Sequence, residues 1–500
     1  MYKIGILFQN RDFEHDVYEL IKAFYPGNEI ISLYEEDDAD YDIRFRVSRD
    51  EEGYTISYDN GIEKKTAHGA VTEGQSSGEA SDALISCDDA HDTRRKNKDA
   101  IKYALYQMLS SATGKTLPWG NLTGIRPVKM AMGMLESGMK NTEIARYMKE
   151  QYLVSPEKTA LAVTIANRER DILKNIDYEN GYSLYVGIPF CPSICLYCSF
   201  SSYPLERWRK YVEDYLDALI KEIQAVSQMM KNRKLDTVYI GGGTPTTLSA
   251  EELERLLSFL KKTLDFSQVK EFTVEAGRAD SITADKLEVL IKYGVTRISV
   301  NPQTMKEETL RLIGRQHTVE QVKEAFYLAR EKGFTNINMD LILGLPGEDE
   351  EDVRRTIEEV KKLNPDSLTV HSLAIKRASR LNQWIEENGI EALHNTDETM
   401  KIAENGAREM GMVPYYLYRQ KNMSGNFENV GYAREGRFGI YNILIMEEVQ
   451  TIIALGAGTV TKRVYGNGRI ERCDNVKDVG LYIEKIDEMI DRKRKLLAEE

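Results

Sequence analysis

Three of the chain's five cysteines lie close together in the segment YVGIPFCPSICLYCSF, which runs from Tyr185 to Phe200. Cys191, Cys195 and Cys198 have the spacing Cys-x3-Cys-x2-Cys. Three thiolates in a short loop can bind three irons of a [4Fe-4S] cluster, which normally has four cysteine ligands. The fourth iron would then be open to another ligand, just as a catalytic zinc keeps an open position.

The alternatives to an iron-sulfur cluster are a structural zinc site and three buried apolar thiols. A structural zinc needs four ligands, and the nearest histidines, His91 and His317, lie far from the motif in the sequence. Clustered cysteines in an intracellular protein usually bind a metal or react, so we favour the cluster. Cys87 and Cys473 lie in polar sequence and are expected to be free thiols without a function. So few cysteines exclude a disulfide scaffold.

A second candidate site is the glycine-rich segment from Ile240 to Thr246, with the sequence IGGGTPT, which follows a predicted strand. Three glycines let a ligand come close to the backbone and expose N–H groups to a carboxylate or phosphate. A plain tight turn explains such a segment equally well when it is taken alone. Its position at a strand end, like that of the cysteine motif, favours a ligand site.

Polar side chains also follow the later predicted strands. A barrel mouth needs such residues to hold the ribose, amino and carboxylate groups of a polar cofactor. Any one of them is compatible with an ordinary loop residue, but a series around one rim indicates a binding site. The residues are Glu275, Asn301, Gln303, Arg315, Asp340 and His371.

The elements that would position these residues alternate between strands and helices from Tyr182 onward. Capping boxes at Ser249 with Glu252 and at Thr318 with Gln321 mark two helix starts. Six successive β-then-α units predict a parallel sheet with right-handed crossovers, either an open doubly wound sheet or part of a (β/α) barrel. The six predicted strands are SLYVGI, DTVYIGG, EFTVEA, TRISV, NINMDLIL and DSLTVHSL.

The remaining sequence predicts three further regions around this core of residues 181–411. Residues 1–90 combine strand-like alternation with one amphipathic helix, which is typical of a small α+β unit. Residues 91–180 read as a helical segment. Residues 412–500 are less regular, and we expect them to form a C-terminal α+β extension that faces the substrate or serves as a lid.

Composition narrows the class of protein. The 500 residues are 42% hydrophobic and 29% charged, which predicts a globular protein of at least two domains. The net charge of -13 disfavours a general affinity for nucleic acid, and the basic run from Arg94 to Lys98 is better explained as a solvated helix start. No apolar run is long enough to cross a membrane, and no signal peptide is recognised, so we expect a cytoplasmic protein.

The cysteine spacing, the GGGTPT segment and the six βα units together resemble the radical S-adenosylmethionine (SAM) enzymes. Segments such as IGGGTPTTL, RISVNPQT and INMDLILGLPGE are similar to the oxygen-independent coproporphyrinogen III oxidase family, which includes HemZ and HemW branches, over residues 183–460. PWGNLTGIRPVKM, in the helical segment, resembles the longer HemZ-type members. This resemblance implies a partial (β/α)6 TIM-like barrel of the radical SAM type.

The resemblance also implies cofactors and site residues. Cys191, Cys195 and Cys198 would bind a [4Fe-4S] cluster, and S-adenosyl-L-methionine would bind its open iron and yield a 5'-deoxyadenosyl radical. By position, contacts to this cofactor would come from Tyr185, Gly242 and Glu275. Contacts to a second S-adenosyl-L-methionine would come from Tyr197, Gly243, Thr244, Gln303, Arg315 and Asp340. Val370 and Val460 would be further contacts.

The family reaction converts coproporphyrinogen III into protoporphyrinogen IX and needs an electron donor such as flavodoxin or ferredoxin. An acidic tetrapyrrole would need cationic partners, for which the C-terminal third offers Lys376, Arg377, Arg419, Lys421, Arg434, Arg437, Lys462 and Arg463.

Two residues depart from the oxidase pattern: Gly187 replaces a histidine, and Phe200 replaces a cysteine in a position where the chaperone branch also has phenylalanine. A haem chaperone and a radical enzyme acting on another tetrapyrrole are therefore the alternatives.

Overall fold

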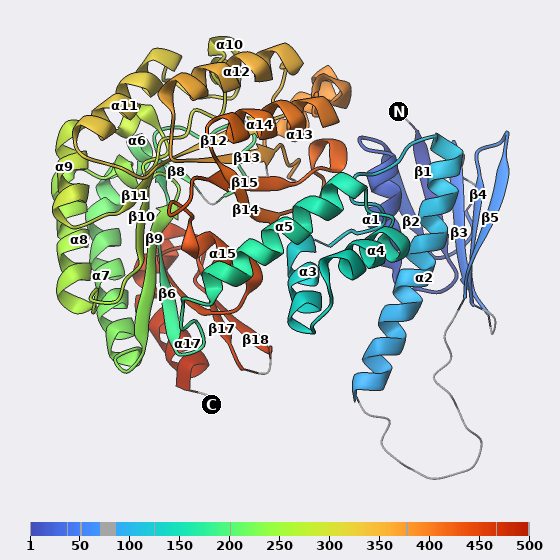
Figure 1. Ribbon diagram of the computed structural model, residues 1–500, viewed down its shortest axis with the longest axis horizontal. Coiled ribbons are helices and arrows are strands. Elements are labelled where there is room, and N and C mark those ends of the chain that lie inside the picture. The colour runs from blue at the N-terminus through green and yellow to red at the C-terminus, as the bar shows by residue number, and fades with distance from the viewer. Residues whose placement is uncertain are drawn as a thin grey trace, which may run out of the picture. The chain divides into compact units, whose positions relative to one another are not determined.

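The computed structural model describes residues 2–37, 39–50, 53–70, 87–124, 126–200, 202–376, 379–466 and 468–498, without the side chains of Ala70 and residues 87–92. The chain forms two compact units (Figure 1). The first unit comprises Met1–Pro127 and Gly133–Val163, and the second comprises Val128–Met132 and Thr164–Glu500. Within the described residues, no helix is long and apolar enough to cross a membrane.

The first unit contains a mixed sheet with the strand order β2-β1-β3-β4-β5. β1 runs parallel to both of its neighbours, whereas β3, β4 and β5 form an antiparallel meander. Residues of β3 alternate between buried and exposed, which agrees with the period-2 pattern from which this strand was predicted. The sequence analysis did not identify β2 and β5. The strands are β1 (Lys3–Phe8), β2 (Glu29–Leu33), β3 (Ile43–Arg49), β4 (Gly53–Asp59) and β5 (Lys64–Ala70).

Two helices, α1 (Glu14–Phe24) and α2 (Cys87–Thr113), complete the core of this unit. Their buried residues, such as Leu20 on α1 and Leu105 on α2, belong to one hydrophobic cluster with Phe45 of the sheet. The α+β unit expected from the sequence is present, but its core extends beyond residue 90 and includes α2, most of which falls in the predicted helical segment of residues 91–180. The rest of that segment forms α3 (Pro127–Glu136), α4 (Asn141–Tyr152) and α5 (Pro156–Leu173).

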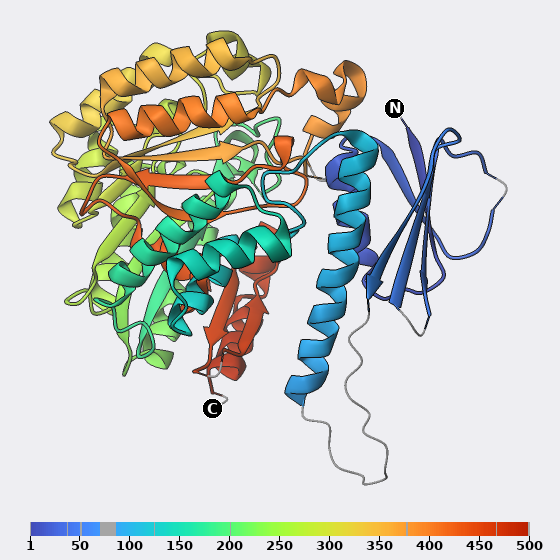
Figure 2. The same ribbon diagram turned by 45° about the vertical axis from the view of Figure 1, so that its right-hand side comes forward.

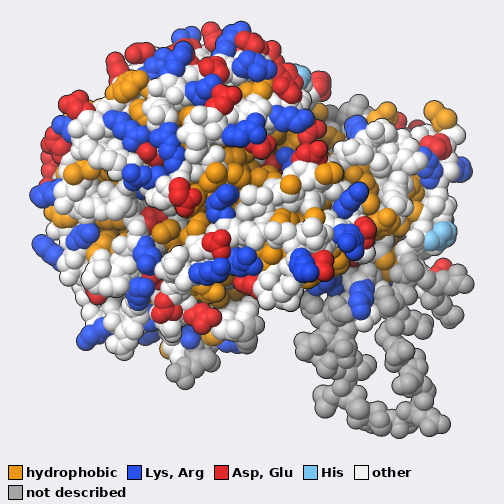
Figure 3. All heavy atoms as spheres, in the orientation of Figure 1, with side chains coloured by type: hydrophobic (Ala, Val, Ile, Leu, Met, Phe, Trp, Pro, Cys, Tyr) orange, Lys and Arg blue, Asp and Glu red, His pale blue; other side chains and the backbone are white. Residues whose placement is uncertain are grey.

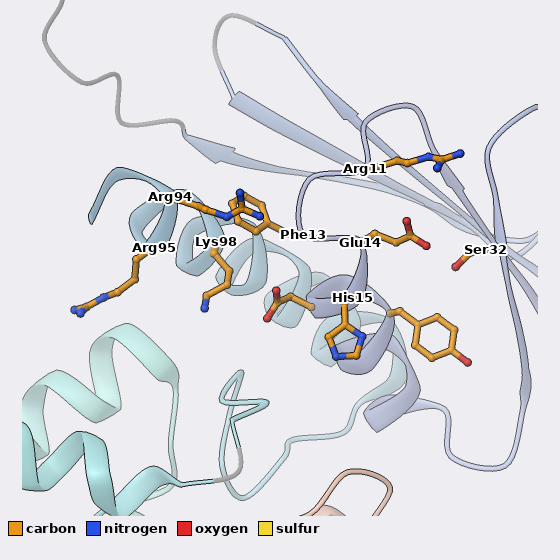
Figure 4. A pocket seen from close by; sticks show the side chains of 10 residues that line it. Arg11, Phe13, Glu14, His15, Ser32, Arg94, Arg95 and Lys98 are labelled. Carbon is orange, nitrogen blue, oxygen red and sulfur yellow. The ribbon is translucent and has the colours of Figure 1, made fainter. Parts of the chain in front are cut away.

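A pocket of about 610 Å³ lies between the start of α1 and the basic part of α2 (Figure 4). Arg94, Arg95 and Lys98 line it, so the basic run noted in the sequence faces this concavity. The carboxyl groups of Glu14 and Asp16 also line the pocket and offset part of the positive charge.

The second unit is built on an eleven-stranded sheet with the order β14-β15-β13-β12-β11-β10-β9-β6-β16-β17-β18. Six central strands, each pairing in parallel with the next, correspond to the six predicted from the sequence. They form the predicted partial (β/α)6 barrel of the radical SAM type. The strands are β6 (Gly181–Ile188), β9 (Lys234–Gly242), β10 (Glu271–Glu275), β11 (Arg297–Ser299), β12 (Ile337–Leu343) and β13 (Ser367–Ser372).

Helices connect successive strands and cover the outer face of the sheet (Figures 1 and 2). Both predicted capping boxes are present: Ser249 with Glu252 starts α8, and Thr318 with Gln321 starts α11. The connecting helices are α7 (Val212–Met229), α8 (Ala250–Thr263), α9 (Ala284–Lys292), α10 (Glu307–Leu312), α11 (Val319–Glu331) and α12 (Glu350–Leu363), followed by α13 (Leu381–Asn388) and α14 (Asp397–Glu409).

The C-terminal residues extend the same sheet at both of its edges. β14 (Val413–Tyr418) and β15 (Asn429–Ala433) lie antiparallel beyond β13. At the other edge, β16 (Thr451–Leu455) pairs in parallel with β6 and is followed by β17 (Val460–Val464) and β18 (Ile470–Asp474). The helices of this region are α15 (Ile440–Glu447), α16 (Val479–Glu484) and α17 (Ile486–Ala498). A substrate-facing or lid role for this region stays a prediction.

Candidate functional site

The three clustered cysteines line one pocket of about 400 Å³ in the second unit. Cys191 ends the short strand β7 (Phe190–Cys191), and Cys195 and Cys198 lie in the loop that follows. Gly242, Gly243 and Thr244 at the end of β9 line the same pocket. The carboxyl ends of neighbouring strands therefore bring the two predicted motifs together, as a parallel sheet requires.

The cysteine side chains are half-buried, and their surroundings suit a metal cluster. Burial raises the pKa of Cys191 to about 11 and also raises the pKa of Cys198. Neutral thiols are thus favoured, and a bound iron-sulfur cluster would supply the positive charge that ionises them. Among the described residues, no three His, Cys, Asp or Glu side chains converge on a single ion.

Hydrogen bonds from several elements fix the cysteine loop. The N–H of Leu196 donates to the carbonyl of Ile313 at 2.9 Å. The hydroxyl of Ser193 donates to the carbonyl of Gly314 at 2.8 Å and accepts from the guanidinium of Arg278 at 2.7 Å. The loop is thus fastened to the segments that follow β10 and α10, so its shape depends on residues far away in the sequence.

The glycines of the second motif are needed because two backbones meet here. A Cβ atom on Gly243 would lie 2.6 Å from the carbonyl oxygen of Phe190 and 2.9 Å from the sulfur of Cys191. Gly242 has a φ of +110°, which L side chains rarely adopt. The sequence predicted close approach by a ligand, and the structure shows close approach by the cysteine loop.

Two partly buried carboxyl groups at the pocket have opposite pKa shifts. Burial raises the pKa of Glu275 to about 7, although its side chain accepts a hydrogen bond of 2.5 Å from the hydroxyl of Tyr239. Burial also raises the pKa of Asp340, but hydrogen bonding to His371 and Asn338 outweighs it, and the net pKa lies below its ordinary value. Near neutral pH, Glu275 can exchange a proton while Asp340 stays ionised, a division that assigns different roles to two carboxyl groups.

Gln303 and Arg315 both line the pocket and have buried polar atoms that lack partners. Gln303 has a φ of +68°, and its backbone bonds to the backbone of β12 at Asp340 and Ile342. Arg315 donates to the carbonyl of Asn301 at 2.6 Å. The Oε1 of Gln303, the Oδ1 of Asn301 and the Nε of Arg315 have no hydrogen-bond partner in the described structure. Buried polar atoms without partners indicate a site for a polar ligand.

Three predicted cofactor contacts do not line this pocket, whereas Tyr197 and the other predicted contacts do. The ring of Tyr185 stacks on that of Tyr239, a pocket residue, with centroids 6.0 Å apart. Val370 is buried within β13, and Val460 is 37% exposed at the start of β17, two strands away from β6. A contact from either valine stays a prediction.

The sequence analysis missed an aromatic wall of the pocket. Tyr239, Tyr416 and Tyr418 line it, and the last two rings stack with centroids 6.3 Å apart. The hydroxyl of Tyr418 lies 3.4 Å from the Nδ1 of His371. A usable signal was present, because the segment YYLY places tyrosines two residues apart, on one face of a strand.

Of the eight candidate cations, Lys376 lines the pocket. Burial lowers the pKa of its amino group. Lys376 has no ion-pair partner among the residues that the structure describes, which leaves it available to an anion. Arg377 lies outside the described residues. The other described candidates do not line the pocket. Arg434 pairs with Asp366, and Lys462 pairs with Glu448. Arg463 donates to the carbonyl of Leu496, and Arg419 donates to that of Asn426.

The surface of the second unit shows no broad field of one sign on the face in view. Figure 3 shows Lys and Arg side chains interspersed with Asp and Glu side chains there.

Comparisons with known proteins place these features in a family. A profile described as the Radical SAM superfamily matches residues 185–360. The chain is 42% identical to the oxygen-independent coproporphyrinogen-III oxidase-like protein HemZ of Bacillus subtilis, over 80% of this chain and 81% of that protein. It is 38% identical to the heme chaperone HemW of Bacillus subtilis over 39% of this chain and 51% of that protein.

Among solved structures, the chain resembles coproporphyrinogen III oxidase (HemN) from Escherichia coli, described as a radical SAM enzyme. The TM-score is 0.50 at 24% identity, over 64% of this chain and 73% of that chain. At this identity the likeness concerns the fold.

Replacing one clustered cysteine tests the cluster assignment. We expect Cys191→Ala, after anaerobic reconstitution with iron and sulfide, to lose most of the visible charge-transfer absorbance and iron content of the wild type, because one of three ligands is gone. Cys473→Ala is the matched control, since Cys473 is a single buried thiol on β18 and should leave both quantities unchanged. Full iron content in Cys191→Ala would contradict the assignment.

The raised pKa of Glu275 predicts a pH-dependent stability. In the unfolded chain this carboxyl ionises near its ordinary pKa of 4.5, but in the folded chain it ionises only near pH 7. The protonated form of Glu275 therefore stabilises the folded state. Its contribution to the free energy of unfolding, about 3 kcal/mol in total, is lost as pH rises from about 4.5 to 7. We expect Glu275→Gln to match the wild type in urea unfolding at pH 4.5 and to be more stable at pH 8. Equal stability at pH 8 would show that Glu275 ionises normally.

Proposed function

Because the chain belongs to the radical SAM family of oxygen-independent coproporphyrinogen-III oxidase-like proteins, we propose that it converts coproporphyrinogen III into protoporphyrinogen IX. Members of this family use a [4Fe-4S] cluster and S-adenosyl-L-methionine. The cluster and S-adenosyl-L-methionine, together with one electron from a donor protein, supply a 5'-deoxyadenosyl radical. The protein's own part is to bind, to orient and to exclude water.

The proposed reaction balances in atoms and electrons. Each of two propionate side chains loses a hydrogen atom from its β-carbon to the radical, which gives 5'-deoxyadenosine. The carboxylate then leaves as CO2, one electron passes to a one-electron acceptor, and a vinyl group remains. Flavodoxin or ferredoxin is the class of donor that we propose, which suits a cytoplasmic protein.

The observation that carries the proposal is one pocket that combines four kinds of lining. The three cysteines line it together with polar groups without partners, including those of Gln303 and Arg315. Tyrosine rings and the half-buried Lys376 complete the lining. Rings suit the flat faces of a tetrapyrrole, and a lysine without an ion pair suits its carboxylates.

We assign roles to the chain's residues on this basis. Cys191, Cys195 and Cys198 hold the cluster, and the polar residues around Glu275 and Asp340 orient S-adenosyl-L-methionine. Lys376 binds a propionate carboxylate. Phe200 is 75% exposed and also lines the pocket, so it offers an apolar contact at the mouth.

A haem chaperone is the second candidate, and specific residues favour it. Phe200 matches the chaperone branch, and Gly187 lacks the histidine of the oxidase branch. A Cβ atom on Gly187 would lie 2.7 Å from the Cγ2 of Thr459, so a larger side chain would require this neighbour to move. A radical reaction on another tetrapyrrole is a third reading of the same pocket.

Anaerobic turnover separates these functions. We expect the reconstituted protein, given coproporphyrinogen III, S-adenosyl-L-methionine and reduced flavodoxin, to release 5'-deoxyadenosine and a product lighter by two CO2 and four hydrogens, as mass spectrometry would show. Tight haem binding and transfer without this product would identify the chaperone. A different tetrapyrrole mass would identify the third reading.

Lys376 provides a test of substrate binding. We expect Lys376→Met to raise the KM for coproporphyrinogen III about tenfold at a nearly unchanged kcat, because a charged hydrogen bond to a carboxylate is lost. The control is Lys401→Met, an exposed lysine on α14 outside the pocket. An unchanged KM in Lys376→Met would remove this residue from the substrate site.

A further inference from the structure

The backbone that leads from β6 into the cysteine loop is held at four successive carbonyl groups. Backbone N–H groups of Gly243, Tyr203 and Thr244 donate to the carbonyls of Ile188, Pro189 and Phe190 at 2.8, 2.8 and 2.7 Å. The hydroxyl of Tyr215, on α7, donates to the carbonyl of Gly187 at 2.7 Å. Gly187 lies between Tyr185 on β6 and Cys191 on β7, so the Tyr215 side chain acts on the backbone that joins these two residues.

Tyr215 also contacts two other parts of the site. It is fully buried, and its ring packs edge-on against that of Phe190 with centroids 5.3 Å apart. Its hydroxyl oxygen accepts a hydrogen bond of 3.1 Å from the N–H of Ala457, in the loop of residues 456–459 that follows β16. One hydroxyl group thus joins β6 to this loop, as donor on one side and acceptor on the other.

A buried ion pair fixes the same loop of residues 456–459. The carboxylate of Glu222, on α7, accepts from the N–H of Gly456 at 2.8 Å and from the hydroxyl of Tyr482 at 2.7 Å. Its other oxygen lies 2.8 Å from the Nζ of Lys493, on α17, and both charged side chains are fully buried. Asn475 bridges them, since its amide group donates to Glu222 at 2.9 Å and accepts from Lys493 at 2.5 Å. It also donates to the carbonyl of Gly456 at 2.9 Å.

The backbones at this junction leave no free space. A Cβ atom on Gly456, whose φ is +97°, would lie 2.5 Å from the hydroxyl oxygen of Tyr215 and 2.6 Å from the carbonyl oxygen of Gly187. Thr459 in turn fills the space in front of Gly187. The hydroxyl of Tyr215 is therefore enclosed, and no water can replace it without displacing a backbone.

We propose that Tyr215 is a positioning residue that sets the end of β6, and with it Tyr185 and the cysteine loop, for S-adenosyl-L-methionine. Glu222 and Lys493 support it by fixing the loop of residues 456–459, which makes the last helix of the chain a part of the site. The inference rests on the family's cofactors and not on the tetrapyrrole substrate.

The test compares two tyrosines of the one network. Tyr215→Phe and Tyr482→Phe each remove one fully buried hydroxyl. That of Tyr215 bonds to β6, whereas that of Tyr482 donates to Glu222. The reduced, reconstituted proteins are studied without any tetrapyrrole, so the outcome is independent of the proposed substrate. The readouts are iron content, the change that S-adenosyl-L-methionine causes in the electron paramagnetic resonance spectrum of the cluster, and the KM for its reductive cleavage.

We expect both variants to unfold at lower temperature than the wild type and to retain iron. In Tyr215→Phe the KM for S-adenosyl-L-methionine should rise about fivefold, the size of one lost hydrogen bond, and the spectral change should need more cofactor. In Tyr482→Phe, the KM for S-adenosyl-L-methionine and the cofactor concentration needed for the spectral change should stay within about twofold of the wild-type values. Equal behaviour of the two variants, or wild-type values in Tyr215→Phe, would overturn the proposal.

A second variant keeps the test decisive if Tyr215→Phe does not fold. Glu222→Gln with Lys493→Met removes both charges and keeps the side-chain volumes similar, which avoids leaving one charge buried alone. We expect it to fold and to raise the KM for S-adenosyl-L-methionine, because the loop that holds Tyr215 loosens. A wild-type KM in this double variant would overturn the supporting role of the ion pair.

Discussion

The candidate site depends on the close approach of two backbones at the carboxyl ends of β6 and β9. Gly243 and Thr244 donate their N–H groups to carbonyls of the segment that enters the cysteine loop. Such bonds form only when the two chains come within hydrogen-bond distance, and a Cβ atom on Gly243 would prevent this. The glycine-rich motif and the cysteine motif are thus one structural feature, although they lie on different strands.

Around this contact the protein buries polar groups that it does not satisfy itself. Asn301, Gln303 and Arg315 each present a polar atom without a partner, and Gln303 also keeps a backbone conformation that costs energy. A folded chain normally avoids both features. Their presence in one pocket, beside a carboxyl group whose pKa is about 7, indicates that stability is given up here for ligand binding.

The C-terminal region contributes to the site through the sheet. β14 adds the tyrosine rings to one side of the pocket, and β16 with its following loop braces β6 on the other. Glu222 and Lys493 anchor this brace, and such a fully buried ion pair is costly unless each charge is well satisfied. The space in front of Gly187 is taken by Thr459 of the same loop. The side chain of Thr459 thus occupies the space that a larger residue at position 187, such as the histidine of the oxidase pattern, would need.

The sequence by itself determined most of the elements of this protein and the class of its cofactors. Period-2 and helical spacing predicted the six βα units, the capping residues predicted the starts of α8 and α11, and the cysteine spacing predicted a cluster. These signals are local, because a strand, a helix start or a short chelating loop depends on residues near each other in the chain. The strands β2 and β5 were missed because their alternation is weak.

Only the tertiary structure decided which polar residues share a pocket and what surrounds them. It grouped Glu275, Gln303, Arg315 and Asp340 with the cysteines, left Val370 and Val460 outside the pocket lining, and selected Lys376 among the seven candidate cations that the structure describes. It also revealed the tyrosine wall and the link from Tyr215 to Lys493. Burial, pKa shifts and unpaired polar atoms arise from contacts between distant segments, so no local pattern in the sequence encodes them.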